Sequence, residues 1–239
     1  MDLEIGNISF NINTGEVAPI TIRVRLDTWD HWLSIAKEMR DIAESAAKDV
    51  LAAHAADDST ALGAALEREF RYGMLSISAS AIAIDAFYAG VAERHGRHPQ
   101  HQEWQVNGLA RHKQVTETLR WTWNLKADKT KTIRDRLKLV YKLRGMAVHP
   151  PADFREPILR PDIDRHVEWR FSHFRAENAR GAFETVSNII EAFLRTYSQA
   201  PRSLQAWVVA SRPRFAVAAG YDVRGAEPPP EVDPSPRSA

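Results

Sequence analysis

Residues 76–91 read SISASAIAIDAFYAGV and are apolar or small at nearly every position, with one carboxylate among them. A helix that is apolar on nearly every side belongs in the centre of a protein core. We expect this run to be the middle of a long helix from about Thr60 to Glu93, capped by the DDS at 57–59. Asp85 interrupts the run, and a buried carboxylate needs a cation or several donors. The run therefore predicts a central core helix and a partner for Asp85.

On both sides of this segment, apolar residues are spaced as on one side of a helix. The preceding helix begins after Asp27 or Thr28 as N-cap and places apolar residues on one stripe as far as Val50. Loop signals fill 94–108, and four prolines lie in 150–162. The other segments with a helical period are 110–124, 130–148, 173–198 and, in a shorter form, 202–210.

The N-terminal residues alternate with a period of two instead. Such alternation predicts two strands, and the NTGE between them predicts a turn. A lone hairpin is marginal in water, so its apolar face is expected to pack on the bundle or on a second copy. The alternating residues are Ile8, Phe10 and Ile12, then Ile20, Ile22, Val24 and Leu26.

These patterns predict a mainly α-helical fold, a bundle of about five helices carrying an N-terminal β-hairpin. We expect the hairpin at 1–26 and one helical domain at 27–210. The Pro- and Ser-rich segment at 211–239 predicts a largely disordered tail.

The composition narrows the class of protein. The chain has 239 residues, 44% of them hydrophobic, which is enough for a sizeable core. It has no cysteine, so disulfides and thiolate metal sites are excluded. The start MDLEIG is unlike a signal peptide, and no apolar run approaches the roughly 18 residues of a membrane span. We expect a soluble, cytoplasmic protein without membrane contact.

Positive charge is concentrated in one part of a chain whose net charge is only +1. Between residues 111 and 144 eleven Lys or Arg face three acids, a local excess of eight positive charges. Such a stretch can attract a polyanion, although a solvated helix face is the commoner explanation of a charge run. The residues that we expect to bind RNA are Arg134, Arg136, Lys138 and Lys142.

The segment LVYKLRGMAVHPP, residues 139–151, ends a helix at a histidine. Pro150 pushes His149 out of the α region, and Pro151 makes re-entry harder. His149 is then free to reach back towards Arg144. A helix C-terminus favours imidazolium and a neighbouring guanidinium opposes it, so the ring can titrate near neutrality. The pair is suited to general acid–base catalysis and to stabilising charge on a phosphate.

The Arg144, four residues, His149 arrangement at the end of a helix resembles the signature of the HEPN superfamily of helical-bundle proteins. The resemblance extends to a core helix with an acid, Asp85, and to a later helix entered through Glu177 and Asn178. It implies a helical bundle across about residues 60–198. Many members are metal-independent endoribonucleases of toxin–antitoxin and phage-defence systems.

The resemblance implies that Arg144 and His149 are catalytic, that two such pairs face each other across a homodimer, and that no metal or cofactor is needed. We assign supporting positions to Asp85 and Gly145. Gly145 stands where the commonest form of the motif has Asn, Asp or His. An antitoxin or other protein partner is also implied. The alternative is a non-catalytic helical module that binds RNA or a protein, in which His149 bonds helix-end carbonyls and Arg144 pairs with Asp85.

A histidine-rich segment and a pair of tryptophans are candidates for other roles. The histidines in H95-G-R-H-P-Q-H101 lack a zinc spacing, and Gly96 and Pro99 prevent helical presentation, so a polar surface loop is favoured over a metal site. Trp121 and Trp123 lie two apart between cations, which suits base stacking. Core or dimer packing is the commoner use of such residues, with one of the pair facing outward or the helix ending there.

Overall fold

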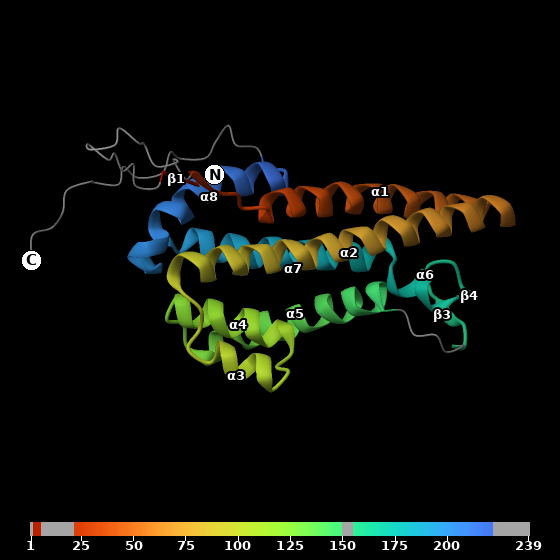
Figure 1. The fold of residues 1–239 in the computed structure, drawn as a ribbon. Coiled ribbons are helices and arrows are strands. Elements are labelled where there is room, and N and C mark those ends of the chain that lie inside the picture. Colours follow the sequence, from red (N-terminus) through yellow and green to blue (C-terminus); the bar gives the residue numbers. More distant parts are fainter. Residues whose placement is uncertain (1, 6–21, 150–154, 222–239) are drawn as a thin grey trace, which may run out of the picture.

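A long antiparallel pair of helices forms the frame of the molecule (Figure 1). α1 (Trp29–Ala55) and α2 (Ser59–His95) are joined by a tight turn in which Asp57 has a left-handed φ of 52°. The carboxylate of Asp58 accepts hydrogen bonds from the amides of Thr60 and Ala61, so the predicted cap of α2 is confirmed.

The computed structural model describes residues 2–5, 22–149 and 155–221. Within these ranges the chain forms eight α-helices, one 3₁₀ turn and two small antiparallel sheets. After α2 come α3 (His101–Val106), α4 (Arg111–Thr122), α5 (Ala127–Val148), β3 (Ile158–Arg160), β4 (Arg165–Val167), α6 (Trp169–His173), α7 (Ala176–Arg195), η1 (Tyr197–Gln199) and α8 (Arg202–Ala219). β1 (Asp2–Ile5) pairs with β2 (Ile22–Arg25).

Helix α2 is the centre of the bundle, as the sequence predicts, and contacts α1, α4, α5, α7 and α8. Its approach to α7 depends on Gly73, because a Cβ at this position would lie 1.9 Å from the carbonyl oxygen of Phe174. By length and composition α2 also passes as a membrane span, contrary to the expectation that no run is apolar enough. However, 61% of its most apolar window is buried in the bundle, as in a core helix.

A buried ion-pair network closes one end of the bundle. Asp27 accepts hydrogen bonds from Arg94 of α2 at 3.0 Å and from the Trp207 indole of α8 at 2.9 Å. Arg214 of α8 bonds Asp27 and Asp30. Burial alone would raise the pKa of Asp27, but these donors hold it below its usual value. The network joins the start of α1 to α2 and α8.

A second buried pair fixes the β3–β4 hairpin at the other end. Arg160, 1% exposed, donates to Glu69 of α2 at 2.6 Å and to Asp162. The other oxygen of Glu69 accepts the amide hydrogen of Ala176, the first residue of α7. Glu69 therefore anchors both the hairpin and the start of α7.

Several expected boundaries need correction. The mainly α-helical class is confirmed, but the described residues form eight helices and not about five: α3 lies in the expected loop, and α6 precedes α7. α8 continues to Ala219 with Pro213 inside it, so the expected tail cannot begin at 211. The second expected N-terminal strand is confirmed at 22–25, where it pairs with residues 2–5. The other expected strand, with Ile8, Phe10 and Ile12, lies outside the described residues.

Candidate functional site at the end of helix α5

The predicted catalytic pair lies at the C-terminal end of α5. The amide of His149 donates to the carbonyl of Gly145 at 2.9 Å, and His149 leaves the helix at φ −127°. The helix thus ends at Val148, directly before the prolines, as their chemistry requires. Arg144 is half-buried and His149 is exposed.

Arg144 lies on the side of α5 that faces the core. It follows Tyr141 by three residues and Leu137 by seven, which places the three on one side of the helix. Leu137 is fully buried and Tyr141 half-buried. Within residues 22–149 and 155–221, Arg144 makes no hydrogen bond or ion pair. Its guanidinium is therefore a half-buried cation that no described side chain neutralises.

The partners of Asp85 are Arg111 and Tyr141, not Arg144. Nε of Arg111 donates to Oδ1 of Asp85 at 2.6 Å, and the Tyr141 hydroxyl donates to the same oxygen at 2.7 Å. The guanidinium of Arg111 also lies over the ring of Tyr88, 4.5 Å from its centroid. The alternative in which Asp85 holds Arg144 is therefore wrong.

This polar cluster keeps both donors protonated. Burial alone would lower the pKa of Arg111, but the Asp85 carboxylate raises it above its usual value. Burial and the same carboxylate raise the pKa of Tyr141 far above its usual value. Sequence reasoning missed Arg111 and Tyr141 as partners, because only the packing of α2, α4 and α5 brings them to Asp85.

Three of the four predicted RNA-binding residues share one exposed side of α5. Arg134, Lys138 and Lys142 follow one another at four-residue spacing, and Lys131 extends the row by one turn. We call these four residues the α5 basic stripe. Arg136 points elsewhere, into the groove between α5 and α7. Of the eleven cations of residues 111–144, Arg111 and Arg120 are held in ion pairs, with Asp85 and Glu117.

His112 of α4 lies within the field of the basic stripe. Burial lowers its pKa first, and the charges of Lys113, Lys138 and Arg134 lower it further, against a smaller opposing effect of Asp135. The imidazole of His112 therefore lies beside several cations, and a phosphate bound there would raise its pKa again, opposite to the effect of these cations. No local pattern predicts this neighbourhood, because His112 and the α5 basic stripe are on different helices.

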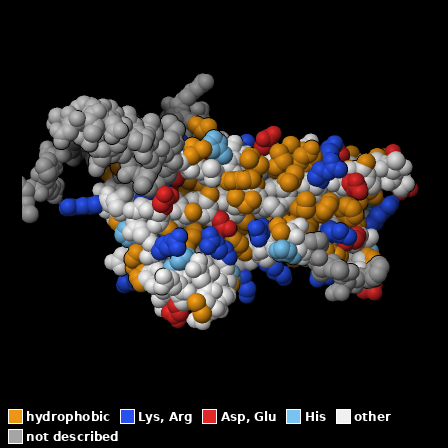
Figure 2. All heavy atoms as spheres, viewed as in Figure 1, with side chains coloured by type: hydrophobic (Ala, Val, Ile, Leu, Met, Phe, Trp, Pro, Cys, Tyr) orange, Lys and Arg blue, Asp and Glu red, His pale blue; other side chains and the backbone are white. Residues whose placement is uncertain are grey.

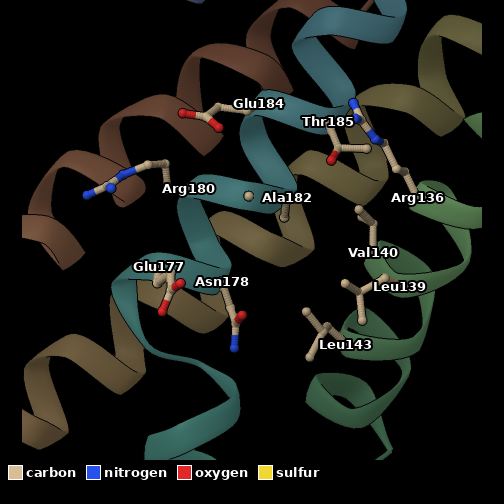
Figure 3. A pocket seen from close by; sticks show the side chains of 11 residues that line it. Arg136, Leu139, Val140, Leu143, Glu177, Asn178, Arg180, Ala182, Glu184 and Thr185 are labelled. Carbon is tan, nitrogen blue, oxygen red and sulfur yellow. The ribbon is translucent and has the colours of Figure 1, made fainter. Parts of the chain in front are cut away.

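A groove of about 370 Å³ separates α5 from α7 (Figure 3). Leu139 and Leu143 face it from α5, and Glu177 and Asn178 from α7. The side chain of Asn178 is hydrogen-bonded to the preceding segment, since its Nδ2 donates to the carbonyl of His173 at 2.9 Å. Glu177 pairs with Arg175. Glu177 and Asn178 thus bond residues that directly precede α7.

The remaining candidates pack within the fold. Trp123 is 2% exposed and meets Phe193 edge to face, so core packing is confirmed for it. Trp121, at the end of α4, contacts His95 and His98, and His98 stacks on Trp104 at 4.2 Å. The histidine segment is therefore packed against tryptophans rather than being only a polar surface loop. Among the described residues no group of three His, Asp or Glu is placed to hold a metal ion.

No protein-family model, curated protein or solved structure matches this chain. The resemblance to the HEPN superfamily therefore rests on the Arg144–His149 spacing and on the helices around it.

Proposed function

We propose that the protein is a HEPN-like, metal-independent endoribonuclease of the toxin or phage-defence type, with Arg144 and His149 of two copies forming a composite site. The observation that carries the proposal is the state of Arg144. It is half-buried beside the core helix, while the carboxylate that was its best candidate partner is held by Arg111 and Tyr141. A cation in such a position favours binding of an anion.

The chemistry follows from the two side chains. The neutral imidazole of His149 takes the proton of a ribose 2′-hydroxyl as its oxygen attacks the adjacent phosphorus. Arg144 stabilises the added negative charge of the phosphorane. The bond from phosphorus to the 5′-oxygen then breaks, the leaving oxygen takes the proton from the imidazolium of His149, and the products are a 2′,3′-cyclic phosphate and a 5′-hydroxyl.

The basic stripe supports RNA as the substrate. It leads along α5 towards the end that carries Arg144 and His149, and side chains one turn apart can follow successive phosphates. The test is cleavage of labelled RNA in excess chelator by wild type, His149→Ala and Arg144→Ala. Arg165→Ala, which removes an exposed ion pair with Asp57, is the control. Cleavage that survives His149→Ala, or that chelator abolishes, overturns the mechanism.

One observation favours a second candidate, a non-catalytic module that binds RNA or a protein partner. Gly145 supplies no polar side chain beside Arg144. The position has room, since no atom lies within 4 Å of a Cβ added there. RNA binding without cleavage by wild type and by Gly145→Asn, at every protein concentration tested, would favour the module over the nuclease.

A further inference from the structure

A pocket of about 190 Å³ lies between the turn of the β3–β4 hairpin, the end of α6 and the first turn of α7. We call it the α6–α7 pocket. Its size suits a single ring system rather than a longer ligand. Four half-buried polar side chains line it together with Pro161, and several polar groups converging on a hollow are typical of a binding site. The polar residues are Ser172, His173, Arg175 and Asn178.

Hydrogen bonds within the chain determine which atoms of His173 and Asn178 remain for a ligand. Nδ1 of His173 lies 2.9 Å from the carbonyl oxygen of Trp169, which can only accept, so Nδ1 carries the hydrogen and Nε2 of the neutral ring is an acceptor. Nδ2 of Asn178 donates to the carbonyls of His173 at 2.9 Å and Ser172 at 3.4 Å, which leaves Oδ1 as an acceptor. Among the described residues no donor bonds either atom. The pocket therefore has two acceptors for which a ligand can supply donors.

The positive charge of Arg175 in this pocket is partly neutralised. Arg175 pairs with Glu177, and the carboxylate of Asp162 lies close enough to interact with it electrostatically. Figure 2 shows basic and acidic side chains intermixed at the end of the molecule where Figure 1 places α6, β3 and β4. A free phosphate presents acceptor oxygens, which would meet two further acceptors here. The pocket is therefore better suited to an uncharged group with both donors and an acceptor.

We propose that the α6–α7 pocket binds one guanine base of the RNA substrate. Single-stranded RNA is recognised through hydrogen bonds to the edges of splayed bases. Guanine carries two neighbouring donors, N1–H and the N2 amino group, beside the acceptor O6, whereas each other base has one donor group on that edge. The two donors match Oδ1 of Asn178 and Nε2 of His173. Arg175 matches O6 and N7, the commonest specific contact of arginine with a base.

The pocket lies next to the proposed catalytic residues. Asn178 lines both the pocket and the groove between α5 and α7, and Figure 3 shows it across the same end of that groove from Leu143. Arg144 directly follows Leu143, and α5 then continues to Val148. A base in the pocket therefore places its ribose and phosphate towards the end of α5. The inference deepens the proposed function, by naming the base that is recognised, and rests on RNA being the ligand.

Binding of short RNAs tests the base without depending on cleavage. Labelled oligoadenylates that carry guanine, inosine or adenine at one central position are titrated by fluorescence anisotropy with His149→Ala, in which the RNA stays intact. The guanine RNA should bind tightest. Inosine, which lacks only the N2 amino group, should bind about tenfold more weakly, because one acceptor of the pocket loses its donor. Adenine should bind no better than inosine.

Variants of Arg175 test the protein side of the contact. Arg175→Gln and the charge-conserving Arg175→Lys, each added to His149→Ala, should bind guanine and adenine RNA equally well, because neither can donate two parallel bonds to O6 and N7. Arg170→Gln is the matched control, since Arg170 also forms an exposed ion pair, with Glu168, but does not line the pocket. It should keep the preference for guanine.

Free guanosine monophosphate distinguishes RNA from a nucleotide as the source of the base. As a competitor it should displace the guanine RNA only at a much higher concentration than unlabelled RNA does, because it lacks the flanking phosphates that meet the α5 basic stripe. Displacement at equal concentration would overturn RNA as the source.

The outcomes separate the base pocket from the nuclease. Equal affinity for guanine and adenine RNA, an inosine RNA that binds as well as guanine, or a preference that survives both Arg175 variants would each overturn the pocket. A guanine preference in binding establishes it whether or not RNA is cleaved. Cleavage that needs Arg144 and His149 but shows no preference for guanine would keep the nuclease and reject the pocket.

Discussion

The hydroxyl of Tyr141 and Nε of Arg111 donate to the same oxygen of Asp85, at 2.7 and 2.6 Å. This carboxylate interrupts the most apolar stretch of the chain, and two donors from two other helices satisfy it. The cluster therefore ties α2, α4 and α5 together and leaves the neighbouring Arg144 outside the network.

Replacement of Arg144 separates a structural from a functional role. Because Asp85 keeps both donors, Arg144→Ala should change the free energy of unfolding by less than about 1 kcal/mol. Tyr141→Phe removes a donor from a half-buried carboxylate and should cost about 1–2 kcal/mol. Thermal and urea melts of the two variants beside wild type measure the difference. A loss of 3 kcal/mol or more in Arg144→Ala would show that this guanidinium holds the fold together.

The Arg160–Glu69 pair should be among the most sensitive positions. Glu69→Ala leaves a guanidinium buried and removes the acceptor of the Ala176 amide, so it should cost about 3–5 kcal/mol. The exposed pair of Arg165 and Asp57 provides the comparison, and Arg165→Ala should cost less than about 1 kcal/mol. Urea denaturation checks both values. Similar losses in the two variants would contradict the burial argument.

Two glycines in helices should respond in opposite directions to alanine. Gly73→Ala forces a Cβ to 1.9 Å from the backbone oxygen of Phe174 and should destabilise strongly, by about 3 kcal/mol or more. Gly145→Ala meets open space and should stabilise α5 by about 0.5–1 kcal/mol. Differential scanning calorimetry distinguishes the two. A lower melting temperature in Gly145→Ala would contradict the open space around this glycine.

Stability should fall in acid in two steps. The pKa values of His98 and His112 are lowered, first by burial, so the unfolded chain takes up protons before the folded one. Their contribution is present above the ordinary histidine pKa of about 6.5 and is lost as pH falls through the lowered values. The lowered pKa values of Asp27, Asp41 and Asp162 give a second loss, below pH about 4.

Replacing the two histidines isolates the first step. In His98→Gln with His112→Gln the slope of stability against pH between about 7 and 5 should flatten, while the loss below pH about 4 remains. Urea titrations across this range, with His166→Gln as the exposed control, measure the slope. An unchanged slope in the double variant would assign the first step to other groups.

RNA affinity should depend on the basic stripe and not on Arg136. The double variant Lys138→Ala with Lys142→Ala should weaken RNA binding. It should also reduce the slope of log affinity against log salt concentration by about two, because each cation that contacts a phosphate releases a counterion. Arg136→Ala, on the groove side of the same helix, should have a smaller effect. Filter binding at several salt concentrations checks this. Equal losses of RNA affinity from replacing Lys138, Lys142 and Arg136 would mean that the RNA also lies across the groove between α5 and α7.

The sequence by itself determined the long helices α1, α2, α4, α5 and α7, because apolar period, caps and prolines act within a few residues. The DDS cap, the central helix and the end of α5 before Pro150 all follow from such local rules. Boundaries were less certain where local signals conflict. α8 passes through Pro213 because its two turns beyond that residue bury Phe215 and Ala218.

Only the tertiary structure decided which side chains meet. Sequence reasoning offered only Arg144 as a partner of Asp85, whereas the packing of α4 and α5 against α2 brings Arg111 and Tyr141 to it. The fold also divided one run of cations into the exposed α5 basic stripe, the groove residue Arg136 and two ion-paired arginines, Arg111 and Arg120. Ion pairs between helices depend on positions far apart in the chain, and no local period encodes them. That Arg144 makes no ion pair with the described residues is therefore a property of the fold.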